Sequence, residues 1–129
     1  MISMQLRFRQ LEGRFAICRM PPDSPVPAGS EATSFISVTR TSDELSIVCP
    51  ADRLPPGAKC EASWTCFKLE GPFPFTLTGV LASFLDPLAK RGVPIFAIST
   101  FDTDYVFVKE ETAGEALDAL RQAGHLLIV

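Results

Sequence analysis

The sequence predicts an α+β protein of ferredoxin-like fold, in which strands and helices follow the order βαββαβ. From residue 61 onward, the apolar pattern gives strand, helix, strand, strand, helix and strand in turn. A similar strand–turn–strand outline occurs earlier in the chain, displaced by 60 residues. We therefore expect two tandem copies, each an antiparallel sheet with its helices on one face.

The first 60 residues form a strand-rich pattern around a proline-rich loop. Residues 6–20 follow a strand pattern that is interrupted near Gly13, and residues 34–39 and 45–49 follow a hairpin pattern. The segment 21–30 contains four prolines, which remove backbone donors and exclude a regular helix. Because this loop stands where the second copy has a long helix, we predict residues 1–60 to be a degenerate unit without its first helix.

Residues 61–129 are predicted to form the complete unit. A strand at residues 62–69 precedes a helix at 78–91, whose apolar positions share one helical face: Leu81, Phe84, Leu85 and Leu88. We expect Thr76 or Thr78 to cap this helix, Pro87 to kink or end it, and Gly92 to stop it.

The rest of this unit reads as a hairpin, a helix and a short strand. Strands are expected at residues 95–100 and 105–109, and the final strand at 126–129. A capping-box pattern from Thr112 to Glu115 predicts the second helix, which Gly124 ends. We expect His125, just past this stop, to face solvent or the helix end.

The 60-residue displacement brings the two hairpin patterns into register. Apolar residues coincide at six pairs of positions: 35/95, 36/96, 38/98, 45/105, 47/107 and 48/108. A hydroxyl coincides at 39/99 and an acid at 44/104. Coincidence between two unrelated hairpins remains the alternative, because any two hairpins share an apolar–turn–apolar outline.

Composition and charge narrow the class of partners. The formal charge is −3 and the sequence pI is about 5.1, without any basic run. Nucleic acid and anionic membranes are therefore not expected as partners, because both require a clustered basic surface. Neither a secretory signal nor a membrane-spanning stretch is present in the sequence, so we expect a cytoplasmic protein.

The cysteines and the single histidine do not form a pattern typical of a metal or catalytic site. Cys18, Cys49, Cys60 and Cys66 lack metal-ligand spacing, and we expect buried, reduced thiols, with a disulfide or a metal site as the alternatives. Around one histidine, no catalytic triad, phosphate loop or metal cluster can be assembled. We therefore expect no enzyme activity, no catalytic residues, no metal and no cofactor.

Three stretches carry a resemblance to a known family: residues 39–50, 81–89 and 96–110. They are similar to small bacterial proteins with tandem ACT domains and to the ACT units of the cytosolic arginine sensors of animals. The likeness spans nearly the whole chain and is strongest between residues 64 and 125. Its most specific motif is Ser-Thr-Phe-Asp-Thr-Asp-Tyr at residues 99–105.

The resemblance implies a ferredoxin-like fold in two copies that binds amino acids or similar small effectors. It also implies that ligand sites lie at interfaces between ACT units, and that Thr100, Phe101 and Asp104 contribute to the ligand site. The arginine sensors carry four ACT units per chain, whereas two are expected here.

Elementary chemistry indicates the same site. In a βαββαβ sheet, the helix start at Gly79 and Val80 and the following hairpin turn lie at one end of the sheet. The helix start favours a carboxylate, Asp102 or Asp104 would bind an ammonium group, and Phe101 would cover the ligand's side chain. The alternative is that the Asp and Thr residues of 100–104 are ordinary turn formers, which bond their own backbone.

The sequence thus favours an amino-acid-binding regulatory module without catalytic activity. The alternative is a ligand-free module for protein interaction or dimerisation, because edge strands of ferredoxin-like sheets pair readily across a symmetry axis. Either function is compatible with a homo-oligomer or a partner protein.

Overall fold

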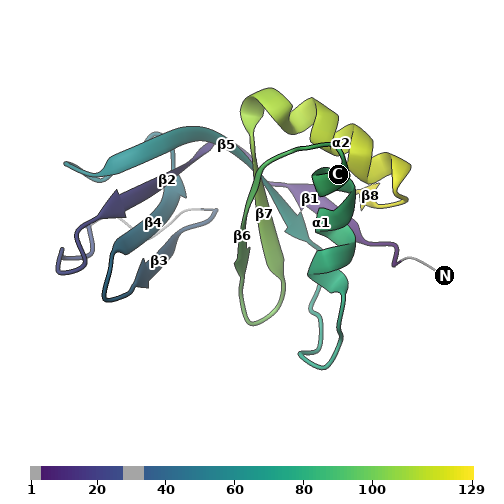
Figure 1. Cartoon of the computed structure of the whole chain (residues 1–129), viewed down its shortest axis with the longest axis horizontal. Coiled ribbons are helices and arrows are strands. Elements are labelled where there is room, and N and C mark those ends of the chain that lie inside the picture. The colour runs from purple at the N-terminus through teal and green to yellow at the C-terminus, as the bar shows by residue number, and fades with distance from the viewer. Residues whose placement is uncertain (1–3, 28–33) are drawn as a thin grey trace. The chain divides into compact units, whose positions relative to one another are not determined.

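The structure, a computed structural model, describes residues 4–27 and 34–129 (Figure 1). The chain divides into two compact units. We name Glu12–Trp64 the N-terminal unit, and the residues up to Leu11 together with Thr65–Val129 the C-terminal unit. These units differ from the predicted ranges 1–60 and 61–129, because the first strand of the chain pairs with strands of the C-terminal unit.

The N-terminal unit is an antiparallel sheet. It contains β2 (Phe15–Met20), β3 (Ser37–Arg40), β4 (Leu45–Pro50) and the first half of β5 (Lys59–Leu69), in the order β3-β4-β2-β5. This is the strand order of a ferredoxin-like sheet. In the part of the unit that the structure describes, loops and turns at residues 21–27 and 51–58 replace the helices of that fold.

Buried apolar residues lie on the sheet of the N-terminal unit. One cluster shares a face of β2 and β4: Ala16, Cys18, Leu45, Ile47 and Cys49. Phe15, Phe35, Val48 and Trp64 are buried as well. In residues 12–27 and 34–64, which the structure describes, strands supply these buried side chains and no helix covers them.

The C-terminal unit confirms the predicted βαββαβ order. The second half of β5 is followed by α1 (Val80–Lys90), β6 (Ile95–Ser99), β7 (Asp104–Lys109), a 3₁₀ turn η1 (Glu110–Thr112), α2 (Ala113–Gln122) and β8 (Leu126–Leu127). Strand β7 pairs with both β6 and β5.

A fifth strand joins the four strands of the predicted βαββαβ unit. Strand β1 (Arg7–Gln10) lies between β5 and β8, antiparallel to β5 and parallel to β8. Phe8 stands opposite Leu69, and its carbonyl accepts the Ile128 N–H at 2.8 Å. The prediction of a purely antiparallel sheet is therefore wrong for this edge, because a strand pattern does not reveal which strand will become its neighbour.

Both helices of the C-terminal unit pack on one face of its sheet. The buried cluster joins residues of β1, β5 and β7 with residues of both helices: Phe8, Phe67, Leu69, Val106, Val108, Phe84, Leu88, Ala116 and Leu120. The rings of Phe8 and Phe84 meet edge to face with centroids 5.2 Å apart. The predicted apolar helix face is thus confirmed for Phe84 and Leu88, which are both fully buried.

The start of α1 differs from the prediction. Gly79, in the left-handed conformation with φ of 81°, precedes the helix, and no side chain caps it. Caps from Thr76 or Thr78 are therefore wrong. Pro87 lies within the helix, which continues to Lys90, whereas Gly92 has the positive φ of 68° expected of a helix stop.

The capping box predicted for α2 is also wrong. Thr112 makes no capping bond to the helix; its hydroxyl donates to the Lys109 carbonyl at 3.0 Å. The 3₁₀ turn η1 leads into the helix directly, so the Thr112 side chain faces backward along the chain. The helix stop at Gly124 is confirmed by its φ of 95°.

His125 is buried, which corrects the prediction that it faces solvent or the helix end. Only 4% of the residue is exposed. Its Nδ1 accepts the Leu6 N–H at 3.1 Å, and its Nε2 lies 3.0 Å from the Ser83 carbonyl. Because Nδ1 is the acceptor, Nε2 carries the hydrogen that bonds Ser83. The imidazole therefore links the chain before β1 to α1.

Two of the four cysteines form a disulfide, which corrects the prediction of reduced thiols for that pair. Cys18 and Cys60 are bonded, and Cys49 and Cys66 are free and buried. Cys18 and Cys60 stand opposite each other where β2 and β5 pair, and this proximity cannot be inferred from their sequence spacing. Burial raises the pKa values of the Cys49 and Cys66 thiols, and Asp52 adds to the effect at Cys49.

Within residues 4–27 and 34–129, no helix has the length and apolar character that crossing a membrane requires.

Candidate functional site

The turn between β6 and β7 is held by its own threonines. The Thr100 N–H and hydroxyl both donate to the Thr103 carbonyl, at 2.8 and 3.1 Å. Thr103 is buried, and its hydroxyl donates to the Leu69 carbonyl at 2.7 Å. The turn is therefore fixed both internally and onto the end of β5.

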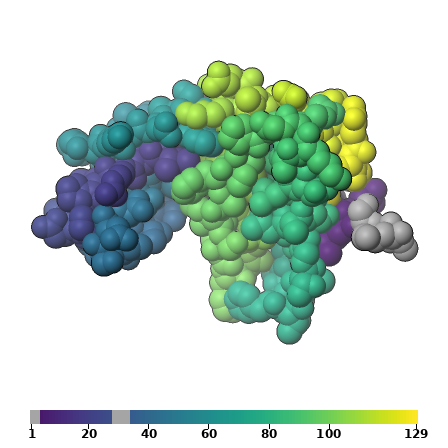
Figure 2. Space-filling view, in the orientation of Figure 1, coloured from purple at the N-terminus to yellow at the C-terminus, as the bar shows by residue number. Residues whose placement is uncertain are grey.

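The loop before α1 contacts this turn. The Phe73 N–H donates to the Asp102 carbonyl at 2.9 Å, and the rings of Phe75 and Phe101 meet edge to face at 5.0 Å. Gly71 allows the close approach, because a Cβ at this position would lie 2.8 Å from the Asp102 carbonyl oxygen. Figure 2 shows the two segments meeting at the lower edge of the molecule.

The start of α1 lies at the same end of the sheet as the β6–β7 turn (Figure 1). Gly79 is exposed and has open space beside its backbone, whereas the Val80 side chain is buried in the core. Val80 therefore offers only its backbone N–H to a ligand. The first turn of any α-helix leaves such N–H groups without a partner in the helix, with the positive end of the helix dipole.

The two predicted acids have different surroundings. Asp104 is partly buried, and its Oδ1 accepts the Ser99 hydroxyl. Asp102 is exposed, and its carboxylate is near Tyr105. Burial first, and then Cys66, Asp102 and Glu70, raise the pKa of Tyr105 above its ordinary value of 10.0.

The structure thus brings Thr100, Phe101, Asp102 and Asp104 together in one turn, with Gly79 and Val80 at the same end of the unit. Gly71, Phe73 and Phe75 also hold this turn and were not among the predicted site residues. A signal for them was present, since two phenylalanines follow a Gly-Pro pair in a segment without any strand or helix period.

Phe75 and Phe101 form an exposed aromatic pair at this end. Their exposed fractions are 74% and 79%, although large apolar side chains are usually covered. Leu77, in the same loop, is 44% exposed. An apolar surface of this kind beside backbone donors and carboxylates can hold the apolar part of a small polar molecule.

The C-terminal unit and the N-terminal unit each contain a hollow besides the turn. One, of about 900 Å³, is lined by residues of α1 and the end of α2, and its lining also includes Gly79, Met4 and His125. The second, of about 550 Å³, lies in the N-terminal unit between residues 12–15 and 50–53. Among the described residues, no group of three or more His, Cys, Asp and Glu side chains could hold a metal ion.

Two family models match the chain. The ACT domain matches residues 59–122, and a model described as an N-terminal domain matches residues 13–57.

Three similar proteins can be compared along most of this chain. A protein from Agrobacterium tumefaciens with a known crystal structure is 39% identical, with a TM-score of 0.91 and coverage of 98% of this chain and 94% of that one. The bovine protein named cytosolic arginine sensor for mTORC1 subunit 1 (Bos taurus) is 27% identical over 73% of this chain and 31% of its own length. The regulatory subunit of aspartate kinase from Thermus thermophilus, in a ligand-free form, is 18% identical with a TM-score of 0.62, and 88% of this chain and 93% of that one are covered.

These likenesses carry different weight. At 18% identity, the aspartate kinase subunit shows a shared fold alone. The chain spans about a third of the length of the curated relatives it matches, 31% and 34%. The Agrobacterium protein matches over nearly its full length and places both chains in one family. The chain therefore belongs to the ACT-domain proteins, with its ACT domain at residues 59–122, and is related to the cytosolic arginine sensors.

Proposed function

We propose that this protein is a regulatory module that binds a free amino acid and has no catalytic activity. The ligand site comprises Gly79 and Val80 at the helix start and Thr100, Phe101, Asp102 and Asp104 in the β6–β7 turn. We also propose that the N-terminal and C-terminal units are two tandem ACT-like units, the first without its long helix. In line with the name of the curated relatives, we propose a cytoplasmic location.

One observation carries the proposal: the loop before α1 and the acidic turn are joined at the same end of the sheet as the helix start. The Phe73–Asp102 hydrogen bond and the Phe75–Phe101 ring contact hold the two segments together. A zwitterion could place its carboxylate at the N–H groups near Val80 and its ammonium group at a carboxylate of the turn. The exposed phenylalanines would then cover its side chain.

Within this site, Asp104 is the stronger candidate for the ammonium group. Its Oδ1 is engaged by the Ser99 hydroxyl, which fixes the carboxylate and leaves further acceptor capacity on its two oxygens. The Thr100 hydroxyl is engaged within the turn, so its role would be to position the turn.

The expected affinity is modest. A carboxylate at an exposed helix start contributes about 0.3–1 kcal/mol, and a charged hydrogen bond about 1.5–3 kcal/mol. Association itself has a substantial entropic cost. Dissociation constants between about 1 mM and tens of μM, or about −4 to −7 kcal/mol, are consistent with these terms and with sensing an abundant metabolite.

A second function has one observation in its favour. Phe75, Leu77 and Phe101 form an exposed apolar surface, which is typical of a protein contact as well as of a ligand site. The same end of the molecule would then be a dimerisation or partner surface without any ligand.

A thermal-shift screen with the twenty amino acids separates these functions. The ligand-binding proposal predicts a saturable rise in melting temperature with one or two of them, because a ligand that binds only the folded state stabilises it. An absence of any response, together with a concentration-dependent dimer that Phe75→Ser and Phe101→Ser dissociate, would favour the interaction module.

For an amino acid found in the screen, Asp104→Asn tests the site. The substitution removes the charge at constant size, and affinity measured by calorimetry is expected to fall by about tenfold or more. Asp43→Asn, in the exposed turn of the other hairpin, is the matched control and should leave affinity unchanged. Equal affinity of the Asp104→Asn variant and the natural protein would exclude Asp104 from the site.

A further inference from the structure

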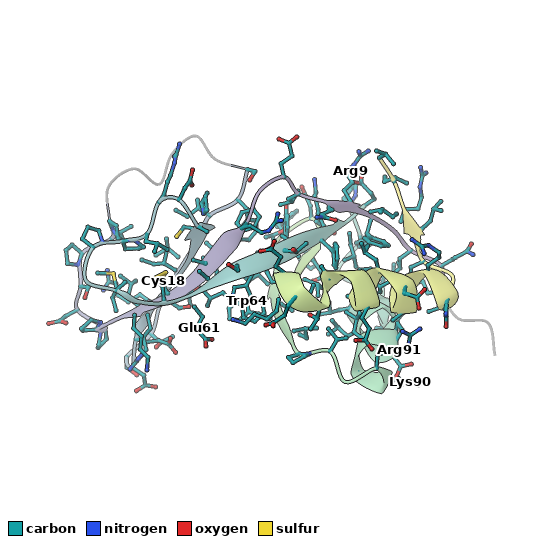
Figure 3. All side chains as sticks on the ribbon, turned by 90° about the horizontal axis from the view of Figure 1, so that it is seen from above. Arg9, Cys18, Glu61, Trp64, Lys90 and Arg91 are labelled. Atoms are coloured by element: carbon teal, nitrogen blue, oxygen red, sulfur yellow. A yellow bond between two sulfur atoms is a disulfide. The ribbon has the colours of Figure 1, made fainter. Side chains whose placement is uncertain are left out.

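The disulfide lies near one end of a strand. Cys18 of β2, labelled in Figure 3, and Cys60 of β5 are directly opposite each other, and Cys60 is the second residue of β5. The neighbouring pairs are Arg19 with Lys59 and Ile17 with Glu61. The bond therefore fastens the beginning of β5 to β2.

An irregularity separates this beginning from the rest of β5. The register with β2 shifts between the Ile17–Glu61 pair and the Phe15–Trp64 pair. Ser63, inside the shift, has a backbone φ of 68°, a value that residues other than glycine rarely adopt. Lys59–Glu61 thus form a short ladder of their own, beyond a bulge.

Little burial supports this short ladder. Lys59, Glu61 and the two residues after it are exposed, whereas every residue from Trp64 to Phe67 is buried. The remaining pairs of the N-terminal unit do not involve β5: β2 pairs with β4 along Phe15–Met20, and β4 pairs with β3 along Ser37–Arg40. Opening the start of β5 would leave those ladders in place.

The two sulfur atoms differ in access. Cys18 is 2% exposed, whereas Cys60 is only partly buried. A thiol from solution therefore reaches Cys60 first, because thiol–disulfide exchange requires direct attack on a sulfur atom.

We propose that Cys18–Cys60 is a reversible thiol–disulfide site, and that its reduction by a dithiol frees the start of β5 from β2. A thiolate of the dithiol attacks Cys60 Sγ and breaks the S–S bond, and Cys18 leaves as a thiolate that takes up a proton. The second thiol of the dithiol, as its thiolate, then attacks the reductant's own sulfur in the mixed disulfide with Cys60. Cys60 leaves and is protonated, the protein gains two electrons and two protons, and the reductant becomes a cyclic disulfide.

Cys49 does not take part in this exchange. It shares the small core cluster with Cys18, but its thiol is buried and donates to the Arg53 carbonyl at 3.7 Å. Burial also disfavours its thiolate, which is the form that reacts. Cys49→Ser is therefore a control that keeps the proposed pair intact.

Hydrogen exchange measured by mass spectrometry tests the proposal. The protein is oxidised with diamide, the bonded cysteines are mapped, and exchange is followed before and after reduction with dithiothreitol. Reduction is expected to raise exchange in residues 59–63 by about tenfold or more, because these amides lose their fastened ladder. Exchange in residues 45–50 and 104–109 should stay unchanged, and reoxidation should restore the original pattern.

The variants fix the assignment. Cys60→Ser should show the fast exchange of residues 59–63 without reductant, and Cys49→Ser should respond to dithiothreitol as the natural protein does. Three results would overturn the proposal: oxidation that does not join Cys18 to Cys60, reduction that leaves residues 59–63 protected, or loss of protection throughout residues 12–64. The last of these results would show that the whole N-terminal unit requires the disulfide to stay folded.

Discussion

The two hairpins of the molecule, β3–β4 and β6–β7, share a turn and differ in what surrounds it. In the first, the Thr41 N–H donates to the Glu44 carbonyl at 2.9 Å; in the second, the Thr100 N–H donates to the Thr103 carbonyl at 2.8 Å. In both turns the threonine hydroxyl lies within hydrogen-bond reach of the same carbonyl, at 3.5 and 3.1 Å. Similar local sequence thus gives the same local geometry.

This correspondence shifts the repeat by one residue from the predicted displacement of 60. The last pair before each turn is Arg40 with Leu45 and Ser99 with Asp104, which sets the hairpins 59 residues apart (99 minus 40, 104 minus 45). Asp102 then corresponds to Asp43. The pattern of apolar matches did not fix this register, because residues 35–36, 47–48, 95–98 and 105–108 are runs of consecutive apolar residues, and such runs also match when shifted by one position.

In the corrected register, Asp104 corresponds to Leu45, which is fully buried. The second hairpin therefore has a carboxylate where the first has a core residue. It also follows a helix, α1, whereas no helix precedes the first hairpin in the described part of the N-terminal unit. Among the residues that the structure describes, only the second hairpin combines an acid with a helix start, and this difference supports a ligand site in the C-terminal unit.

The largest expected effect concerns the packing of the C-terminal unit, the unit that contains the second hairpin and its preceding helix. His125→Phe removes the acceptor of the Leu6 N–H and the donor to Ser83, so two backbone groups lose a partner. Urea denaturation should show a loss of about 1–3 kcal/mol in the free energy of unfolding. Arg121→Ala, at an exposed position of α2, should stay within about 0.5 kcal/mol. If both variants are equally stable, the buried histidine has no such role.

A smaller effect tests whether the two turns are equivalent. Thr41→Val and Thr100→Val each remove the hydroxyl from a turn while keeping the branched shape. Each should lower the free energy of unfolding by about 0.5–1.5 kcal/mol, measured by denaturant titration. A loss confined to Thr100→Val would show that the turns are alike in shape only.

The smallest effect concerns the charge at the tip of the second hairpin. The chain has one tyrosine, so an ultraviolet titration reports Tyr105 alone. Its pKa should lie above the ordinary 10.0, and Asp102→Asn should lower it while Asp43→Asn should not. Because the folded state keeps this proton longer than the unfolded chain does, the Tyr105 contribution to stability is present below pH 10.0 and is lost as the pH rises through the folded-state pKa. If the Tyr105 pKa is the same in the Asp102→Asn variant as in the natural protein, the Asp102 carboxylate does not act on Tyr105.

Much of the fold could be predicted because it depends on the pattern of residues that are close together in the sequence. The helix face with Phe84 and Leu88, the break near Gly13 and the stops at Gly92 and Gly124 all follow from the periodicity and backbone freedom of a few neighbouring residues. The turn of the candidate site was predictable for the same reason, since Thr and Asp bond their own backbone.

The failures concern contacts between distant residues. The pairing of β1 with β8 and the hydrogen bond between Leu6 and His125 each join residues 119 positions apart. The Cys18–Cys60 bond joins residues 42 positions apart. Phe75 was missed because its importance depends on contact with Phe101, in another loop. In the same way, Thr76, Thr78 and Thr112 are good capping residues by type, but the neighbouring turns direct the chain elsewhere.

The sequence by itself determined the class of the protein, the order of its strands and helices, and the acidic turn at residues 100–104. The tertiary structure alone decided which strands became neighbours, which cysteines met, and that the loop before α1 lies against that turn. The physical reason is that periodicity and turn chemistry act over a few residues, whereas strand pairing and side-chain burial depend on the whole packed core.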